Sequence, residues 1–74
     1  MNKFVFQVVI EKDSEGYFAS CPALQGCYTQ GNSYEEVLLN IEDAIRLHIE
    51  DRLDEEEPIP AIQSVSLAAV EVRV

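Results

Sequence analysis

The sequence predicts an α+β fold in which one main helix packs on an antiparallel sheet, in the chain order β-β-β-α-β. Apolar and polar residues alternate near both ends of the chain, and this period of two is typical of β-strands. Glycine and proline residues divide the first half of the chain into short segments. One longer stretch near the centre repeats its apolar residues with the period of an α-helix.

The chain has 74 residues, of which 47% are hydrophobic. This composition favours a folded protein over a disordered tail, and the length predicts a single domain over residues 1–74. A domain this short has a thin core. We therefore expect it to form a homodimer or a higher oligomer.

Three short strands are expected before the helix, joined as a meander. The first runs from Phe4 to Ile10, where every second residue is apolar on one face. Asp13 to Gly16 is expected to form a hairpin loop, in which Gly16 supplies a positive φ. The return strand runs from Tyr17 to Cys21, and the third strand from Cys27 to Gln30.

A capping box predicts where the helix begins. Ser33 and Glu36 lie three residues apart, so that each side chain satisfies a backbone amide. Glu35 and Glu36 also suit the positive end of the helix dipole. We expect the helix to run from Tyr34 to Leu53. Its apolar stripe, which is expected to pack on the sheet, consists of Val37, Leu38, Ile41, Ala44, Ile45 and Ile49.

The helix is expected to end at a run of four acidic residues, because negative charge opposes the dipole at a helix C-terminus. Pro58-Ile59-Pro60 then predicts a stiff, extended linker. A final strand is expected from Val65 to Val74, where the residues alternate again. Its open edge and apolar face predict an oligomer interface formed by Val70, Val72 and Val74.

The charge of the chain is strongly acidic, with 14 Asp and Glu residues against 5 Lys and Arg residues and a net charge of −9. Such a surface repels phosphate backbones, so direct binding of nucleic acid by this chain is not expected. It attracts basic partners instead, although solubility alone also explains such a charge. The predicted partner-binding residues are Glu42, Asp43, Glu50, Asp51, Asp54, Glu55, Glu56 and Glu57.

No catalytic, cofactor-binding or metal-binding residues are predicted. His48 is the one histidine of the chain, so there is no histidine pair for a metal or a proton relay. The acidic residues do not converge from strand ends as they do in two-metal nucleases, and we expect no enzyme activity. Cys21 and Cys27 are expected to be reduced, buried side chains rather than a disulfide or metal ligands.

The sequence also predicts where the protein resides. Its N-terminus shows no signal peptide, and no apolar run approaches the length of a membrane-spanning helix. We therefore expect a cytoplasmic protein without a membrane partner.

A set of short motifs follows a fixed order along nearly the whole chain. These motifs are Asp13-Ser14-Glu15-Gly16-Tyr17, Cys21-Pro22-Ala23-Leu24-Gln25-Gly26-Cys27, Thr29-Gln30-Gly31, Glu35-Glu36, Asn40-Ile41 and Pro58-Ile59-Pro60. In this order and spacing they resemble the HicB-like antitoxin family. The resemblance implies a partial RNase H-like fold without the carboxylate set of the nuclease. It also implies binding to HicA-like toxins, which are small basic ribonucleases that cut messenger RNA.

The chain departs from the family pattern at three places. Ala23 stands where an acidic residue is usual, and Val37 where an alanine is usual. Many members continue into a DNA-binding segment, and no such domain is expected in residues 1–74. The sequence thus predicts an antitoxin-type protein that neutralises a HicA-like toxin by contact. The alternative is a stand-alone oligomeric domain that binds an unknown protein or a small ligand.

Overall fold

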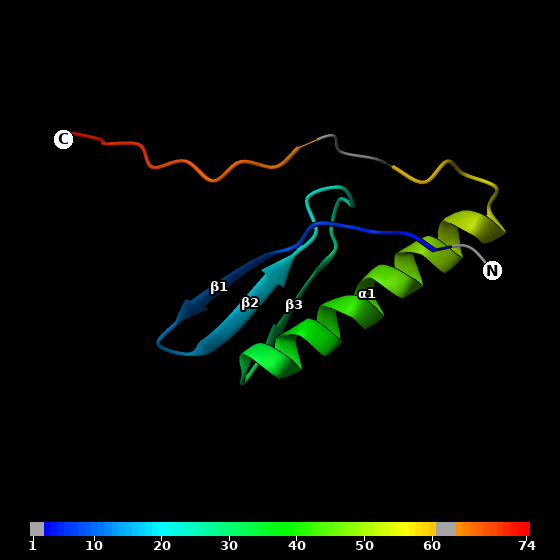
Figure 1. Ribbon diagram of the computed structural model, residues 1–74, viewed down its shortest axis with the longest axis horizontal. Helices are drawn as coiled ribbons and strands as arrows, with labels where there is room; N and C mark the ends of the chain where they lie inside the picture. The colour runs from blue at the N-terminus through cyan, green and yellow to red at the C-terminus, as the bar shows by residue number, and fades with distance from the viewer. Residues whose placement is uncertain (1–2, 61–63) are drawn as a thin grey trace.

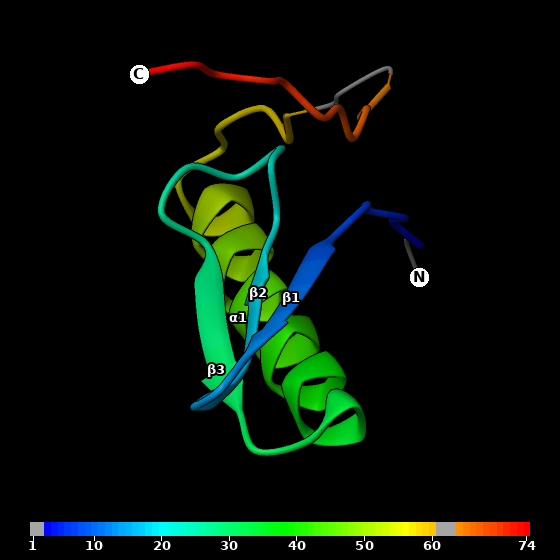
Figure 2. The same ribbon diagram turned by 90° about the vertical axis from the view of Figure 1, so that its left-hand side faces the viewer.

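The computed structural model describes residues 3–60 and 64–74 and confirms the α+β class (Figure 1). Three strands, β1 (Val9–Asp13), β2 (Gly16–Ser20) and β3 (Tyr28–Gly31), form an antiparallel sheet in the order β1-β2-β3. One helix, α1 (Tyr34–Asp54), lies across one face of this sheet (Figure 2). The predicted meander of three strands followed by one helix is therefore present.

The hairpin between β1 and β2 closes at the pair formed by Asp13 and Gly16. The Asp13 carboxylate accepts a hydrogen bond of 2.8 Å from the backbone N–H of Glu15, which holds the loop. Gly16 has a φ of 138°, a conformation that favours glycine. A Cβ atom at this position would also lie 2.9 Å from the carbonyl oxygen of Gly31. The predicted role of Gly16 in the turn is confirmed.

The connection from β2 to β3 is a compact loop held by its own backbone. Cys21 donates its N–H to the carbonyl of Cys27 at 3.0 Å, and Leu24 donates to the carbonyl of Cys21 at 3.1 Å. This loop places the Leu24 side chain in the core, where it is 1% exposed. The loop therefore contributes to the core as well as reversing the chain.

The start of α1 follows the predicted capping box with one change. The Ser33 hydroxyl accepts the N–H of Glu36 at 3.0 Å, as predicted. The Glu36 carboxylate accepts the N–H of Asn32 at 3.0 Å, one residue before the N-cap. Gly31 lies so close to the helix that a Cβ there would be 2.7 Å from the backbone nitrogen of Val37. A glycine is thus needed where β3 passes the first turn of α1.

The helix ends at Asp54, one residue later than predicted. The N–H of Glu57 donates to the carbonyl of Arg52 at 2.8 Å, and that of Glu56 to Leu53 at 3.2 Å. These two bonds form a Schellman motif. Its left-handed position is occupied by Glu56, with a φ of 57°, where a glycine is more usual.

The core lies between α1 and one face of the sheet. Its buried residues come from β2, the loop after it and the helix, namely Ala19, Cys21, Leu24, Cys27, Val37, Ile41 and Ile49. Five of the six predicted stripe residues lie in or against this cluster, including Ala44 and Ile45, whereas Leu38 is only partly buried. No element of the described chain covers the opposite face of the sheet (Figure 2). On that face the Phe18 and Tyr28 rings stack with centroids 5.8 Å apart.

The predicted second and third strands agree with β2 and β3 to within one residue at each end, whereas the first and the last differ more. The first, predicted over Phe4 to Ile10, begins only at Val9. β2 ends at Ser20 and turns into the loop, so residues 3–8 have no neighbouring strand with which to pair. The final strand, predicted over Val65 to Val74, is not formed in the single chain, since residues 64–74 pair with no strand there.

The C-terminal tail, which we define as residues 64–74, extends away from the rest of the molecule (Figure 1). The radius of gyration is 14.4 Å, whereas a compact chain of this length has about 11 Å. The tail therefore makes the molecule more extended, but it adds no paired strand to the sheet of its own chain.

Candidate partner-binding surface

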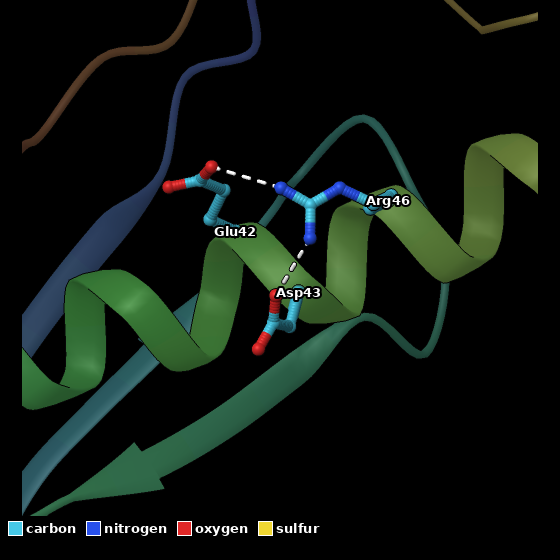
Figure 3. A network of polar contacts seen from close by, with 3 residues as sticks. All are labelled: Glu42, Asp43 and Arg46. Atoms are coloured by element: carbon cyan, nitrogen blue, oxygen red, sulfur yellow. Dashed lines mark hydrogen bonds and ion pairs between the residues drawn. The ribbon is translucent and has the colours of Figure 1, made fainter.

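The predicted acidic residues all lie on the exposed side of α1 and at its C-terminal end. Glu42 and Asp43 sit on either side of Arg46 (Figure 3). The guanidinium donates to Glu42 at 3.0 Å and to Asp43 at 2.8 Å. All three side chains are more than half exposed, so each pair adds at most about 1 kcal/mol to stability. Arg46 nevertheless offsets part of the negative charge in the middle of the helix.

The charge is less compensated towards the end of the helix. Glu50 and Asp51 are exposed on the next turn. They are followed by the acidic run, which we define as Asp54, Glu55, Glu56 and Glu57. Glu57 lies 3.9 Å from Arg52. Within residues 3–60 and 64–74, the other five of these six carboxylates take part in no ion pair.

The backbone adds to this negative field. The carbonyl groups at a helix C-terminus carry a partial negative charge, which is equivalent to about half an elementary charge. The acidic run lies at this end of α1. Exposed carboxylates and helix dipole therefore produce one negative region, over Glu50, Asp51 and residues 54–57, which we call the C-terminal acidic surface. It has the charge that a basic protein surface requires.

The cysteines and the histidine lie elsewhere. Cys21 and Cys27 are both buried, as predicted, and the structure forms no disulfide between them. Burial, and to a smaller extent the nearby Cys21, raises the pKa of the Cys27 thiol, which makes it a weak nucleophile. His48 is partly buried. In the described part of the chain, no three histidine, cysteine or acidic residues are grouped so that they can hold a metal ion.

The predicted oligomer-interface residues are apolar and belong to a different part of the chain from the acidic surface. Val70, Val72 and Val74 are exposed in the C-terminal tail. Within residues 3–60 and 64–74, none of the three packs against the core cluster.

Sequence reasoning missed one exposed surface, the open face of the sheet with the stacked Phe18 and Tyr28 rings. The signal was present in the alternation of β2, because Ala19 faces the core and its neighbour Phe18 faces away from it. The alternation alone does not show that these rings are exposed. They are exposed because no element of the described chain covers that face of the sheet.

A family model decides what kind of protein this is. The model of the "HicB_like antitoxin of bacterial toxin-antitoxin system" matches residues 6–72. The chain belongs to the HicB-like antitoxin family. This family is not a catalytic one, and the resemblance noted in the sequence is confirmed.

Relatives and a solved structure agree with this family assignment. A UPF0150 protein of Helicobacter pylori is 43% identical over 68 residues, which cover 92% of this chain and 94% of the relative. A UPF0150 protein of Synechocystis is 45% identical over 56 residues, covering 74% and 71% of the two chains. A chain of the solved "HicA3 and HicB3 toxin-antitoxin complex" matches with a TM-score of 0.64 and 30% identity. That match covers 81% of this chain and 70% of the other.

The described residues include no helix with the length and apolar character needed to cross a membrane. Helix α1 of this HicB-like chain presents charged residues along its exposed side.

Proposed function

We propose that this protein is an antitoxin that neutralises a small, basic, HicA-like toxin that cuts messenger RNA, and that it acts by protein–protein contact. One observation carries the proposal. A chain from a solved complex between a HicA and a HicB protein shares the fold over 81% of this chain. Membership of the antitoxin family supports the same role.

The C-terminal acidic surface is the proposed contact for the toxin. A ribonuclease must hold a polyanion, so its substrate-binding surface is positively charged. Carboxylates that lie against this surface compete with RNA for it. Glu42 and Asp43 belong to the proposed contact, but Arg46 already neutralises part of their charge. We therefore assign the larger contribution to Glu50, Asp51 and residues 54–57.

Charge acts mainly on the rate at which the two proteins associate. Exposed charges separated by more than about 8 Å are screened at physiological ionic strength. Binding through the acidic surface is consequently expected to slow down as salt is added. The chain itself acts by occupying the toxin in the cytoplasm, without a catalytic step, a cofactor or direct contact with nucleic acid.

The test first asks whether a short basic reading frame lies beside this gene, and it uses the protein encoded there as the toxin. Adding the antitoxin should abolish cleavage of messenger RNA once the two proteins are equimolar. The pair of substitutions Glu50→Gln and Asp51→Asn should slow association and flatten its dependence on salt. The matched control is Glu11→Gln with Glu15→Gln, which removes the same charge from the exposed β1–β2 hairpin. It should leave the association rate nearly unchanged.

Two results would contradict the proposal. Undiminished RNA cleavage in the presence of excess protein would show that this chain is not the antitoxin of that toxin. It would favour the alternative, a stand-alone domain with another partner. Equal effects of the two variants would show that the acidic surface acts only through net charge and is not the contact.

A further inference from the structure

The loop between β2 and β3, residues 21–27, begins and ends with a cysteine (Figure 1). Cys21 is 2% exposed and Cys27 is 3% exposed, and both belong to the core cluster. Neither thiol takes part in the proposed contact with a toxin. The two cysteines are therefore buried nucleophiles that the proposed function leaves unused.

The two cysteines lie directly opposite one another across the sheet. The last pair of the β2–β3 register is Ser20 with Tyr28. One step further, the same register brings Cys21 opposite Cys27. The N–H of Cys21 donates to the carbonyl of Cys27 at 3.0 Å, so these residues form a hydrogen-bonded antiparallel pair. Both side chains point to the helix side of the sheet, where they join Ala19 in the core.

This placement suits a disulfide. The Cα atoms of a hydrogen-bonded antiparallel pair are about 5.5 Å apart, and those joined by a disulfide are most often about 5.5–6 Å apart. The pKa of the Cys27 thiol indicates the same proximity, because Cys21 is the second cause, after burial, of its upward shift. A neighbouring charge has such an effect only over a few ångströms. The bond can thus form without displacing the two strands.

A metal ion fits the pair less well. A structural zinc site needs more ligands than two thiolates supply. Within residues 3–60 and 64–74, no further histidine, cysteine or acidic side chain joins the two cysteines in a group that can hold a metal ion. The chemistry available to the pair is therefore that of a dithiol.

We propose that Cys21 and Cys27 form a redox switch, which is a dithiol at rest and an intramolecular disulfide under oxidising conditions. The oxidant is a small-molecule disulfide, such as oxidised glutathione. The thiolate of one cysteine attacks a sulfur atom of this disulfide, and one glutathione thiolate leaves and takes up a proton. The thiolate of the other cysteine then attacks the mixed disulfide, so that the bond between the two cysteines forms and the second glutathione leaves. The chain loses two hydrogen atoms, and oxidised glutathione is reduced to two thiols.

Local opening of the loop gives the oxidant access to the thiols. Besides the bond between the two cysteines, the N–H of Leu24 donates to Cys21 and the N–H of Cys27 to Leu24, each at 3.1 Å. Breaking these bonds exposes the thiols without unfolding the helix. Because burial is the main cause of the raised pKa of Cys27, opening also makes its thiolate more available. Once formed, the disulfide holds the loop closed with Leu24 in the core.

The disulfide also couples the redox state of the chain to its folding. It removes conformations of the unfolded chain, and for the short loop of residues 21–27 it should raise the equilibrium constant for folding at least about tenfold. By thermodynamic linkage, folding must favour the disulfide over the dithiol by the same factor. This factor distinguishes a pair that the fold positions from two cysteines that are only near each other in the sequence.

Equilibration of the full-length chain with reduced and oxidised glutathione tests the switch. Free thiols are blocked at each ratio, and mass spectrometry of the peptide with both cysteines gives the oxidised fraction. We expect one product, the intramolecular disulfide. At a fixed concentration of reduced glutathione, half oxidation should need at least about tenfold less oxidised glutathione in buffer than in denaturing urea. A chain that stays reduced, that keeps glutathione on one cysteine, or that oxidises equally in buffer and in urea would overturn the proposal.

Hydrogen exchange shows where oxidation acts. The amides of Leu24 and Cys27 should exchange at least about tenfold more slowly in the oxidised chain, because the disulfide suppresses opening of the loop. The internal control is the amide of Glu15, which donates to Asp13 in the hairpin at the other end of β2 and should exchange at an unchanged rate. Cys21→Ala keeps a small apolar side chain in the core and should show no slowing under the same oxidant. Equal slowing at Glu15, or slowing in the variant, would contradict a switch in this loop.

Discussion

The two ends of α1 differ in how well their residues fit the local chemistry of a helix terminus. At the N-terminal end, Ser33 and Glu36 satisfy backbone amides, and Asn40 donates to the carbonyl of Gln30 in β3 at 2.8 Å. At the C-terminal end, acidic residues face the negative pole of the helix dipole, and Glu56 occupies a left-handed conformation. The first end joins the helix to the sheet.

We interpret the difference as one between an end that stabilises the fold and an end proposed to serve binding. Natural proteins tend to violate local rules at sites with a function and to compensate elsewhere. The acidic run violates two rules within four residues, the preference for cations at a helix C-terminus and for glycine in a Schellman motif. This supports the proposal that the C-terminal acidic surface serves binding.

The largest effect is expected at the contact between β3 and the helix. Gly31→Ala should lower the free energy of unfolding by about 2 kcal/mol, because the new methyl group meets the Val37 backbone. Urea denaturation measures this loss of unfolding free energy. Gly26→Ala is the control, since Gly26 has a φ of 78° but open space around it. It should cost about 1 kcal/mol, from backbone strain alone. Equal losses would mean that the close approach of β3 to the helix contributes little.

The N-cap should show the next effect. Ser33→Ala removes the acceptor for the N–H of Glu36 and should cost about 1 kcal/mol of unfolding free energy. Ser66→Ala, in the exposed tail, should leave thermal and urea denaturation unchanged. If Ser33→Ala lowers the free energy of unfolding no more than Ser66→Ala does, the N-cap does not contribute to the difference between the two ends of α1.

The C-terminal end should respond in the opposite direction. Glu56→Gly should stabilise the protein by about 0.5–1 kcal/mol, because relief of the left-handed strain exceeds the entropy that glycine adds to the unfolded chain. Glu56→Gln retains the strain and removes only the charge. If both variants stabilise the protein equally in urea denaturation, the cost at this position comes from the charge of Glu56 and not from backbone strain.

The smallest effect concerns the helix dipole. Glu35→Lys in the first turn should destabilise the protein by about 0.5 kcal/mol, and Glu55→Lys at the C-cap should stabilise it by a similar amount. Both changes alter the net charge equally, so they serve as controls for one another. Denaturation at low and high salt should show both effects shrinking as salt is added. The same sign at both ends would indicate general charge repulsion.

Local patterns predicted the parts of the fold that depend on near neighbours in the chain. The hairpin at Gly16 and the cap at Ser33 each form within a few residues. The stripe through Val37, Ile41 and Ile49 follows the helical period and is buried as predicted. The acidic residues on the exposed side of the helix were also predicted, because a stripe on one side leaves the other to solvent.

The failures share one cause. Phe4 to Val8 and Val65 to Val74 have the alternation of strands, yet neither segment is paired in the single chain. The open face with Phe18 and Tyr28 was missed as well. Each of these depends on what lies beside a segment, and alternation records only the direction of side chains.

The sequence by itself determined the three-stranded meander, the capped helix, its buried stripe and the motifs of the HicB-like family. It did so because turns, caps and helix periodicity arise from residues close together in the chain. Only the tertiary structure decided that β1 begins at Val9, that one sheet face is uncovered and that the tail leaves its own sheet. Strand pairing needs a partner edge at hydrogen-bonding distance, and whether such an edge exists is a property of the whole packed chain.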